Sequence, residues 1–441
     1  MLNFICENNP MRSKRLLYLL PAFFCLLIIL PSCEKQNDDT LPSVSILAPT
    51  ELEEFSVGDS IRVIADISHG SPVSSIKVSL LNGNSIPVLD PIYIFPGLTA
   101  YHLDRYFPVD ENLESGLYTL LVSATDGTNT RNVYRKLSIR GLERFFERAI
   151  AICRPNTLKT LVYSIDDDGV FQNIRSLDYG YTDSDISSDQ RQLYILKPNP
   201  DILYAYKLED ISEDYSITAS PPYPIYNDVS YYNSLAYVAT GNGYVKAYDK
   251  NGYPSFLTAP NVDTIPKLVI RHFSYVIAYC ERRGGPERFL RQYHAGTGIF
   301  RAGIKINFSA VEIFSISPDF VVLLGNKETE SSVFIYNSID YNMEEEIPMP
   351  AGLISGGVQI SSNVFLISHE NGIYQYNHET KTVIAWLTGV EADVIAYDDL
   401  RQLVYFSEDE KVYVCRVTDA VTVQEITLPY EILKLHIQYN N

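Results

Sequence analysis

The sequence predicts an all-β protein in two parts: a small β-sandwich followed by a seven-bladed β-propeller that the C-terminal strand closes. Three observations predict this. Between residues 43 and 140, short stretches of alternating apolar and polar residues are separated by turn-forming residues. From residue 142 to residue 441, one strand pattern recurs with a period of about 40 residues. This second part lacks the 3.6-residue period that helical repeats of similar length would show.

A secretory signal peptide is expected before the folded parts. A basic segment, residues 12–15, precedes an apolar run, residues 16–30, that is too short to span a bilayer comfortably. The segment Leu30-Pro31-Ser32-Cys33 resembles a lipobox, in which signal peptidase II cuts before a cysteine acylated on its sulfur. This resemblance implies a lipoprotein signal peptide at residues 1–32 and a membrane anchor on Cys33. The alternative is a cleaved signal followed by an unmodified cysteine, and the start codon, Met1 or Met11, stays open.

The charge balance excludes one class of partner. The chain carries 35 basic and 54 acidic residues, which gives a net charge of -19. Binding to a phosphate backbone needs clustered lysines and arginines, and no nucleic-acid motif occurs, so we expect no nucleic-acid partner.

The cysteines predict no disulfide framework. After Cys33 only Cys153, Cys280 and Cys415 remain, each within an apolar run and without CxxC spacing. We expect buried, inert thiols, with a Cys153–Cys415 disulfide as the open alternative.

A polar tether, residues 33–42, leads into the first domain, residues 43–140. About seven short strands in a hundred residues, with a hairpin signal at Asn82-Gly83, predict a small sandwich. Its segments Ile46-Leu47-Ala48-Pro49-Thr50, Val57-Gly58-Asp59-Ser60 and Gly116-Leu117-Tyr118, with Ala124-Thr125-Asp126-Gly127, resemble bacterial immunoglobulin-like modules. The cysteine pair of antibody domains is absent.

The second domain, residues 142–441, repeats a strand that can be aligned on its last residue. The seven aligned residues are Tyr163, Tyr206, Tyr248, Tyr293, Tyr336, Tyr376 and Cys415, at spacings of 43, 42, 45, 43, 40 and 39. Another apolar strand precedes each one, which is typical of propeller blades. The first blade lacks an innermost strand, and residues 433–438 resemble an inner strand of a later blade. The C-terminus is therefore predicted to complete the first sheet. The blades resemble those of bacterial seven-bladed propellers in general, without a WD or kelch signature.

The sequence is poor in catalytic motifs. No HExxH, GxSxG or P-loop occurs, and the seven histidines lack metal-ligand spacing, so catalytic residues stay unknown and no metal or cofactor is predicted. Asp166-Asp167-Asp168-Gly169 and Asp183-Ser184-Asp185 could offer oxygen ligands to calcium, but neither continues into an EF-hand pattern. A hairpin turn is the preferred interpretation of the first segment.

Two segments supply candidate ligand-binding residues. Propellers usually bind ligands at the mouth of the central channel, where loops between strands and between blades meet. One long loop, residues 281–288, carries Arg282, Arg283 and Arg288, whose guanidinium groups could pair with a carboxylate or a sulfate on a ligand. The alternative is a solvated loop with internal Arg–Glu pairs.

The second segment, residues 221–232, links two blades and is rich in tyrosine. Tyr223, Tyr226 and Tyr231 offer flat rings on which a sugar can stack. The alternative is packing between blades, with the ring in the core and the hydroxyl in water.

A lipid-anchored immunoglobulin-like module that carries a propeller resembles cell-envelope lipoproteins of the Bacteroidota, many of which accompany outer-membrane uptake systems for glycans. Asp38 and Asp39 also resemble export signals for the outer face in that group. The resemblance implies an outer-membrane lipoprotein, exposed on the cell surface, whose propeller recognises a glycan or an envelope protein without catalysis. Two alternatives stay open: a polysaccharide hydrolase or lyase whose catalytic groups converge from several blades, and a scaffold subunit of an outer-membrane complex.

Overall fold

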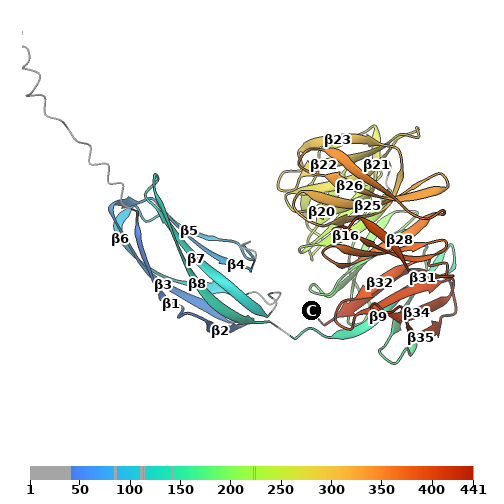
Figure 1. Ribbon diagram of the computed structural model, residues 1–441, viewed down its shortest axis with the longest axis horizontal. Coiled ribbons are helices and arrows are strands. Elements are labelled where there is room, and N and C mark those ends of the chain that lie inside the picture. Colours follow the sequence, from blue (N-terminus) through green and yellow to red (C-terminus); the bar gives the residue numbers. More distant parts are fainter. Residues whose placement is uncertain are drawn as a thin grey trace, which may run out of the picture. The chain divides into compact units, whose positions relative to one another are not determined.

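The computed structural model describes residues 41–83, 87–109, 113, 115–141, 143–221, 223 and 225–440. Every regular element in these residues is a β-strand, so the all-β prediction is confirmed. The predicted signal peptide, Cys33 and the tether up to residue 40 lie outside the described residues. None of the described segments forms a helix that could cross a membrane. The chain divides into two compact units at Leu142 and Glu143 (Figure 1).

Two sheets make up the first unit. One has the order β1 (Ser43–Ala48), β3 (Ser60–Val73), β6 (Leu98–Pro108); the other has the order β2 (Glu53–Ser56), β8 (Thr130–Arg140), β7 (Gly116–Thr125), β4 (Ser75–Leu81), β5 (Ile92–Ile94). Alternate residues of the strands are buried, as in Ile61, Val63, Ala65 and Ile67 of β3. These residues join those of β4, β7 and β8 in one hydrophobic core, because a strand turns every second side chain to the same side.

Seven four-stranded antiparallel sheets make up the second unit. The first contains β36 (Ile432–Tyr439), β9 (Phe146–Asn156), β10 (Lys159–Ile165) and β11 (Phe171–Leu177). The second contains β12 (Asp183–Ser187), β13 (Gln192–Lys197), β14 (Ile202–Lys207) and β15 (Glu213–Thr218), and the third β16 (Tyr226–Tyr232), β17 (Leu235–Thr240), β18 (Val245–Tyr248) and β19 (Pro254–Leu257). The fourth contains β20 (Thr264–His272), β21 (Tyr275–Arg282), β22 (Arg288–His294) and β23 (Phe300–Ile306), and the fifth β24 (Ser309–Ser315), β25 (Phe320–Lys327), β26 (Glu330–Asn337) and β27 (Asn342–Pro348). The sixth contains β28 (Ile354–Ser361), β29 (Val364–His369), β30 (Gly372–Asn377) and β31 (Thr382–Thr388), and the seventh β32 (Ile395–Asp398), β33 (Leu403–Glu408), β34 (Lys411–Arg416) and β35 (Thr422–Thr427).

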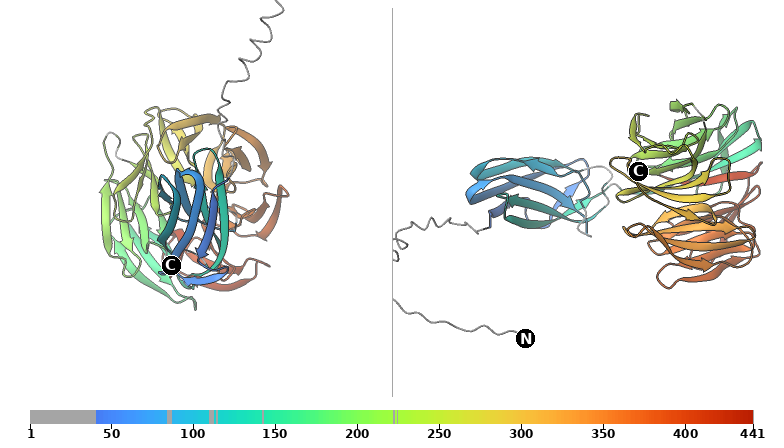
Figure 2. Two further views of the ribbon diagram at one scale, coloured as in Figure 1. Left: turned by 90° about the vertical axis from the view of Figure 1, so that its left-hand side faces the viewer. Right: turned by 90° about the horizontal axis from the view of Figure 1, so that it is seen from above.

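These sheets follow one another in chain order around a ring, from green through yellow and orange to red (Figure 2). The first strand of each sheet, β12, β16, β20, β24, β28 and β32, contacts that of the next, and β36 contacts both β32 and β12. A closed ring of radially arranged sheets defines a β-propeller. The C-terminal strand β36 pairs antiparallel with β9, for example Leu435 with Ala151, as the sequence predicts.

The aligned tyrosines lie on the third strand of each sheet and are buried. Tyr248, for instance, packs in a cluster that joins the second sheet to the third. A large ring fills the space between two twisted sheets, and the tyrosine repeat therefore reflects packing between sheets.

The three cysteines of the second unit behave as inert core residues. Cys153, Cys280 and Cys415 are buried and unpaired, which confirms the prediction of free buried thiols. Burial raises the pKa of Cys153 and of Cys280 to about 12, so both stay protonated.

Candidate functional site: one loop face and the central channel

The structure brings together two candidates that lie far apart in the sequence. Tyr223 precedes β16, and Arg283 follows β21, yet the Arg283 guanidinium carbon lies 3.9 Å from the centroid of the Tyr223 ring. Arg283 Nη2 donates a hydrogen bond to the carbonyl oxygen of Gly241 at 2.6 Å, and Nε donates to that of Val262 at 3.1 Å. A guanidinium stacked on an aromatic ring and fixed by two carbonyls is a rigid arrangement.

All four segments in this contact emerge on one face of the propeller. They are the β15–β16, β17–β18, β19–β20 and β21–β22 connections. Successive strands of an antiparallel sheet run in opposite directions, so alternate connections share an end. Four connections of one face thus converge on Arg283.

The backbone around Tyr223 is closely packed. Tyr223 has a φ of 61°, in the left-handed region that a tyrosine rarely adopts. The Ile225 amide donates to the Tyr223 carbonyl at 2.8 Å, and the Gly241 amide donates to the Ile225 carbonyl at 2.6 Å. A Cβ on Gly241 would lie 2.8 Å from Ile225 Cβ, so only glycine permits this approach. Such strained, tightly held residues are common at binding sites.

The side chains of this region remain open to solvent. Tyr223 is 51% exposed, Ile225 46% and Val262 70%. We call Tyr223, Ile225, Val262 and Arg283 the Tyr223 patch. An exposed aromatic ring with aliphatic neighbours and a fixed guanidinium has the composition of a binding hot spot.

The other two tyrosine candidates serve the fold. Tyr226 is only 1% exposed and lies in the core between the second and third sheets, so its ring is not available to a ligand. Tyr231 stacks on Tyr194 with centroids 6.1 Å apart, and its hydroxyl donates to Asp189 at 2.6 Å. Both rings face the second sheet, and a β-bulge or irregularity in the β16–β17 register lies between Tyr226 and Asp228; the tyrosine-rich composition alone could not reveal this.

The other two arginine candidates have acidic neighbours. Arg282 pairs with Glu287 at 3.2 Å, which is the internal pair of the alternative interpretation. Arg288 lies opposite Glu281 in the β21–β22 register. Arg283, in contrast, forms no ion pair with any described residue.

A charged cluster that no sequence motif predicts lies where the first strands of the sheets and β36 meet. It comprises Asp183, Asp185, Asp228, Glu312 and Lys434, all half-buried on the first strands of their sheets or on β36. Lys434 Nζ lies 3.3 Å from Asp183 Oδ1. Only Asp183 and Asp185 lie in a recognisable acidic segment of the sequence. Asp228, Glu312 and Lys434 come from three other strands that the closed ring brings together, so they form no local motif.

Burial shifts the pKa values of carboxyl groups in this cluster upward. Burial raises the pKa of Asp185 to about 6 and that of Glu312 to about 7, and burial together with the charge of Asp183 also raises the pKa of Asp228. Asp183 raises the pKa of Lys434, which therefore stays charged. One permanent cation thus lies among carboxyl groups of which two, Asp185 and Glu312, change charge near neutral pH.

Three of these carboxylates connect neighbouring sheets. Asp183 accepts a hydrogen bond from the Val229 amide at 3.1 Å, and Asp185 accepts one from the Tyr231 amide at 2.6 Å. In the next pair of sheets, an Asp228 oxygen accepts from the Val269 amide at 2.8 Å. First strands of adjacent sheets do not share a ladder, so these side chains satisfy otherwise unpaired amides.

The described residues offer little else for catalysis or metal binding. Ser184 Oγ lies 2.8 Å from His436 Nε2, but Ser184 is 1% exposed and burial lowers the pKa of His436 to about 3. A substrate cannot reach this pair. No group of three histidine, cysteine or acidic side chains with metal-binding geometry occurs in the described residues. Asp166 accepts from the Val170 amide within the β10–β11 hairpin, in accord with a turn.

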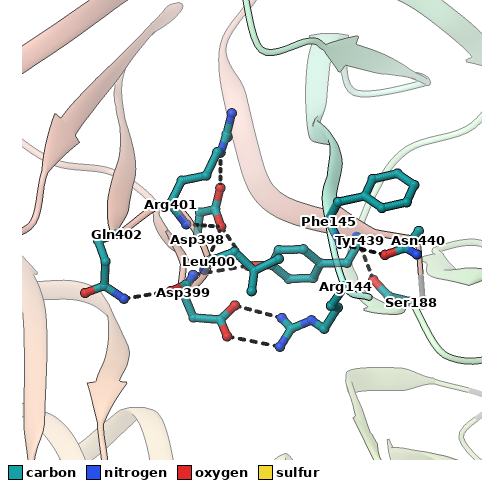
Figure 3. A network of polar contacts seen from close by, with 10 residues as sticks. All are labelled: Arg144, Phe145, Ser188, Asp398, Asp399, Leu400, Arg401, Gln402, Tyr439 and Asn440. Carbon is teal, nitrogen blue, oxygen red and sulfur yellow. Dashed lines mark hydrogen bonds and ion pairs between the residues drawn. The ribbon is translucent and has the colours of Figure 1, made fainter. Parts of the chain in front are cut away.

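A second network joins the start of the unit to its end (Figure 3). The Arg144 guanidinium donates to both oxygens of Asp399, at 3.0 and 2.7 Å, and stacks 4.0 Å from the Tyr439 ring centroid. The Tyr439 hydroxyl donates to Asp398 at 3.1 Å, and Asp398 also pairs with Arg401. This network connects β36, a strand of the first sheet, to the end of β32 in the seventh sheet.

Comparisons with known proteins concern the fold alone. No protein family and no curated protein matches the chain. Among solved structures, the computationally designed Ika8 protein is 11% identical, covering 67% of this chain and 92% of that one, with a TM-score of 0.47. The β-propeller domain of Cps50 (Swd1) from Myceliophteria thermophila is 10% identical over 57% and 88%, and the Dos1 propeller 12% over 66% and 88%, each with a TM-score of 0.46. The class of protein is therefore an all-β chain with a β-propeller, an assignment that rests on the sheet topology.

Proposed function

We propose that this chain is a lipid-anchored binding protein of the cell envelope, with its anchor on Cys33 and its propeller recognising a glycan or an envelope protein. In this proposal the seven sheets are the blades of a seven-bladed propeller, the first unit is an immunoglobulin-like spacer, and the protein serves a nutrient-uptake system at the outer membrane. The observation that carries the binding role is the Tyr223 patch, a rigid and exposed aromatic group on one loop face.

The central cluster supports a binding role over a catalytic one. Its aspartates Asp183, Asp185 and Asp228 each accept a backbone amide of the next sheet, which commits them to the fold. A polysaccharide hydrolase or lyase is the second candidate, because a carboxyl group with a pKa of about 7, such as Glu312, suits general acid–base catalysis at neutral pH.

A single assay separates these functions. The chain without its signal peptide is incubated with plant, host and microbial polysaccharides, and both retention and released reducing ends are measured. Retention without release, lost in Tyr223→Ala and kept in Tyr253→Ala, is the expected result; Tyr253 is a matched control because it is 67% exposed on the β18–β19 connection. Release of reducing ends that disappears in Glu312→Gln would replace binding by catalysis.

The anchor is tested in the cell. A chain that carries Cys33 should incorporate a radioactive fatty acid and fractionate with the outer membrane, whereas Cys33→Ser should do neither. Surface exposure is then scored by protease treatment of intact cells. Labelling of the Cys33→Ser chain would contradict the proposed anchor.

A further inference from the structure

We propose that the Tyr223 patch binds a carbohydrate that carries carboxylate groups, with a carboxylate on Arg283 and the sugar ring on Tyr223. This inference rests on the proposed function and names the ligand class of the same site. It follows from the unused hydrogen-bond donors of Arg283, the fixed position of the Tyr223 ring and the charges around them.

Arg283 retains donors for an anion. A guanidinium group has five N–H donors. Arg283 uses one on Nε and one on Nη2 for the carbonyls of Val262 and Gly241. Within the described residues, both donors on Nη1 and the second on Nη2 have no protein partner. Two adjacent donors of this kind match the two oxygens of a carboxylate.

The surrounding charges leave Arg283 as the cation of the patch. Arg282 is neutralised by Glu287, and Arg288 lies opposite Glu281. The carbonyl of Asp263 accepts the Arg283 amide at 2.8 Å, which places one exposed acidic residue beside the site. A chain of net charge -19 repels polyanions at long range. An acidic ligand must therefore gain its affinity from direct contacts with a local cation, here Arg283.

Tyr223 supplies the second contact. Half of its surface is exposed, and the left-handed backbone, the Gly241 approach and the Arg283 stack hold the ring in place. A ring that is already ordered loses little conformational entropy on binding. The guanidinium covers one face of the Tyr223 ring, 3.9 Å from its centroid, so a pyranose packs against the part of the ring that stays exposed while its carboxylate binds the outward edge of the guanidinium. The two contacts together select an acidic sugar over a neutral one.

The test compares acidic polymers with neutral partners of the same backbone. The probes are polygalacturonate, alginate and hyaluronate, each paired with its methyl-esterified form, and binding is measured by biolayer interferometry on the chain without its signal peptide. We expect at least one acidic polymer to bind and its ester to bind about tenfold more weakly, because the ester cannot accept a charge-assisted bidentate pair.

Three variants and one control localise the interaction. Arg283→Lys keeps the charge but loses the planar fork, and Tyr223→Ala loses the stacking ring; both should weaken binding about tenfold. Asp263→Asn removes a neighbouring negative charge and should strengthen it. The control Arg301→Lys changes an exposed arginine on β23 that bonds Tyr341, and should leave binding unchanged. Thermal unfolding of each variant verifies that it is folded.

The outcomes distinguish a failure of the inference alone from a failure of the proposed function. Equal binding of esters and acids, with loss in Tyr223→Ala alone, would overturn the acidic ligand and leave a glycan-binding protein. Binding of an acidic polymer that Arg283→Lys and Tyr223→Ala do not change would overturn this site. Failure of every acidic and neutral polymer to bind would overturn both the inference and the glycan half of the proposed function, leaving a protein partner.

Discussion

At the scale of single residues, the Tyr223 patch depends on a glycine. A methyl group at residue 241 would meet Ile225 Cβ at 2.8 Å and the Tyr223 carbonyl at 3.1 Å. Both contacts are shorter than ordinary packing allows, so Gly241→Ala must displace the segment that holds Tyr223. We expect a loss of about 1 to 3 kcal/mol in the free energy of unfolding, together with weaker ligand retention. Thermal unfolding and the retention assay measure the two effects.

The matched control is Gly356→Ala, because its added methyl group would meet only the Ser368 hydroxyl at an ordinary 3.5 Å. That variant should retain ligand normally. If Gly241→Ala behaves like Gly356→Ala in both measurements, the close approach of the backbone does not hold the patch.

The central carboxyl groups predict a pH dependence of stability. Asp185 and Glu312 have pKa values of about 6 and about 7 in the folded chain, above the ordinary value near 4 of an unfolded chain. The folded state therefore binds these protons more tightly. Their contribution to stability is fully present below about pH 4 and is lost as the pH rises through about 6 to 7. Solvent in the channel screens part of this effect because both side chains are only half-buried.

We expect Glu312→Gln to unfold at a higher temperature than the natural chain at pH 8 and to show a flatter profile between pH 5 and pH 8. The variant keeps the shape of the side chain and removes the charge. Thermal unfolding at four pH values measures this, with the exposed Glu379→Gln as the control. Parallel profiles for the natural chain and Glu312→Gln would show that Glu312 does not titrate in this range.

At the scale of elements, β36 completes the first sheet. It covers the inner edge of β9 and contributes Leu435, Ile437 and Tyr439 to the core between the first and seventh sheets. A propeller without it has an unpaired edge and an open seam. We expect a chain that ends at residue 431 to lose cooperative unfolding of the second unit.

The missing strand can also be added to the truncated chain as a separate peptide. A peptide of residues 430–441 should restore a cooperative transition when added to the truncated chain, and the same peptide with Leu435→Lys should not. Circular dichroism during heating follows both. A truncated chain that unfolds like the full chain would show that closure by β36 is not needed for stability.

The elements were predictable wherever a local pattern repeats. The tyrosine period indicated the repeated sheets, because six of the seven sheets place a large ring at the same position of their third strand, and Cys415 occupies it in the seventh. The missing inner strand before β9 predicted the pairing with β36. The candidate functional site was harder to predict from the sequence than the strands. Tyr226 and Tyr231 come from the same tyrosine-rich segment as Tyr223, but their places on β16 bury the first ring and let the second donate a hydrogen bond to Asp189. Glu312 and Lys434 meet only through closure of the ring, and no spacing in the sequence encodes that.

At the scale of the whole propeller, closure depends on side chains as well as on the β36 ladder. Arg144 lies before β9, the first strand of this unit along the chain, and donates two hydrogen bonds to Asp399, which follows β32. Its guanidinium also stacks on Tyr439 of β36. Three parts of the chain that are distant in sequence are joined by one side chain. Because Arg144 and Asp399 are 32% and 47% exposed, the ion pair alone should contribute less than about 1 kcal/mol, and stacking on Tyr439 adds to it.

We therefore expect Arg144→Lys, which keeps the charge but loses the planar fork and the stack, to destabilise the propeller nearly as much as Arg144→Ala. The loss should appear first at the seam, as faster amide hydrogen exchange in β36 and β9 and not in β20 to β27, because local opening precedes global unfolding. Arg154→Lys is the matched control, since Arg154 pairs with Glu431 at 2.8 Å without an aromatic stack in the described residues. Equal exchange in all strands, or full rescue by lysine, would show that a simple charge pair at Arg144 is sufficient and that the stack on Tyr439 does not hold the ring closed.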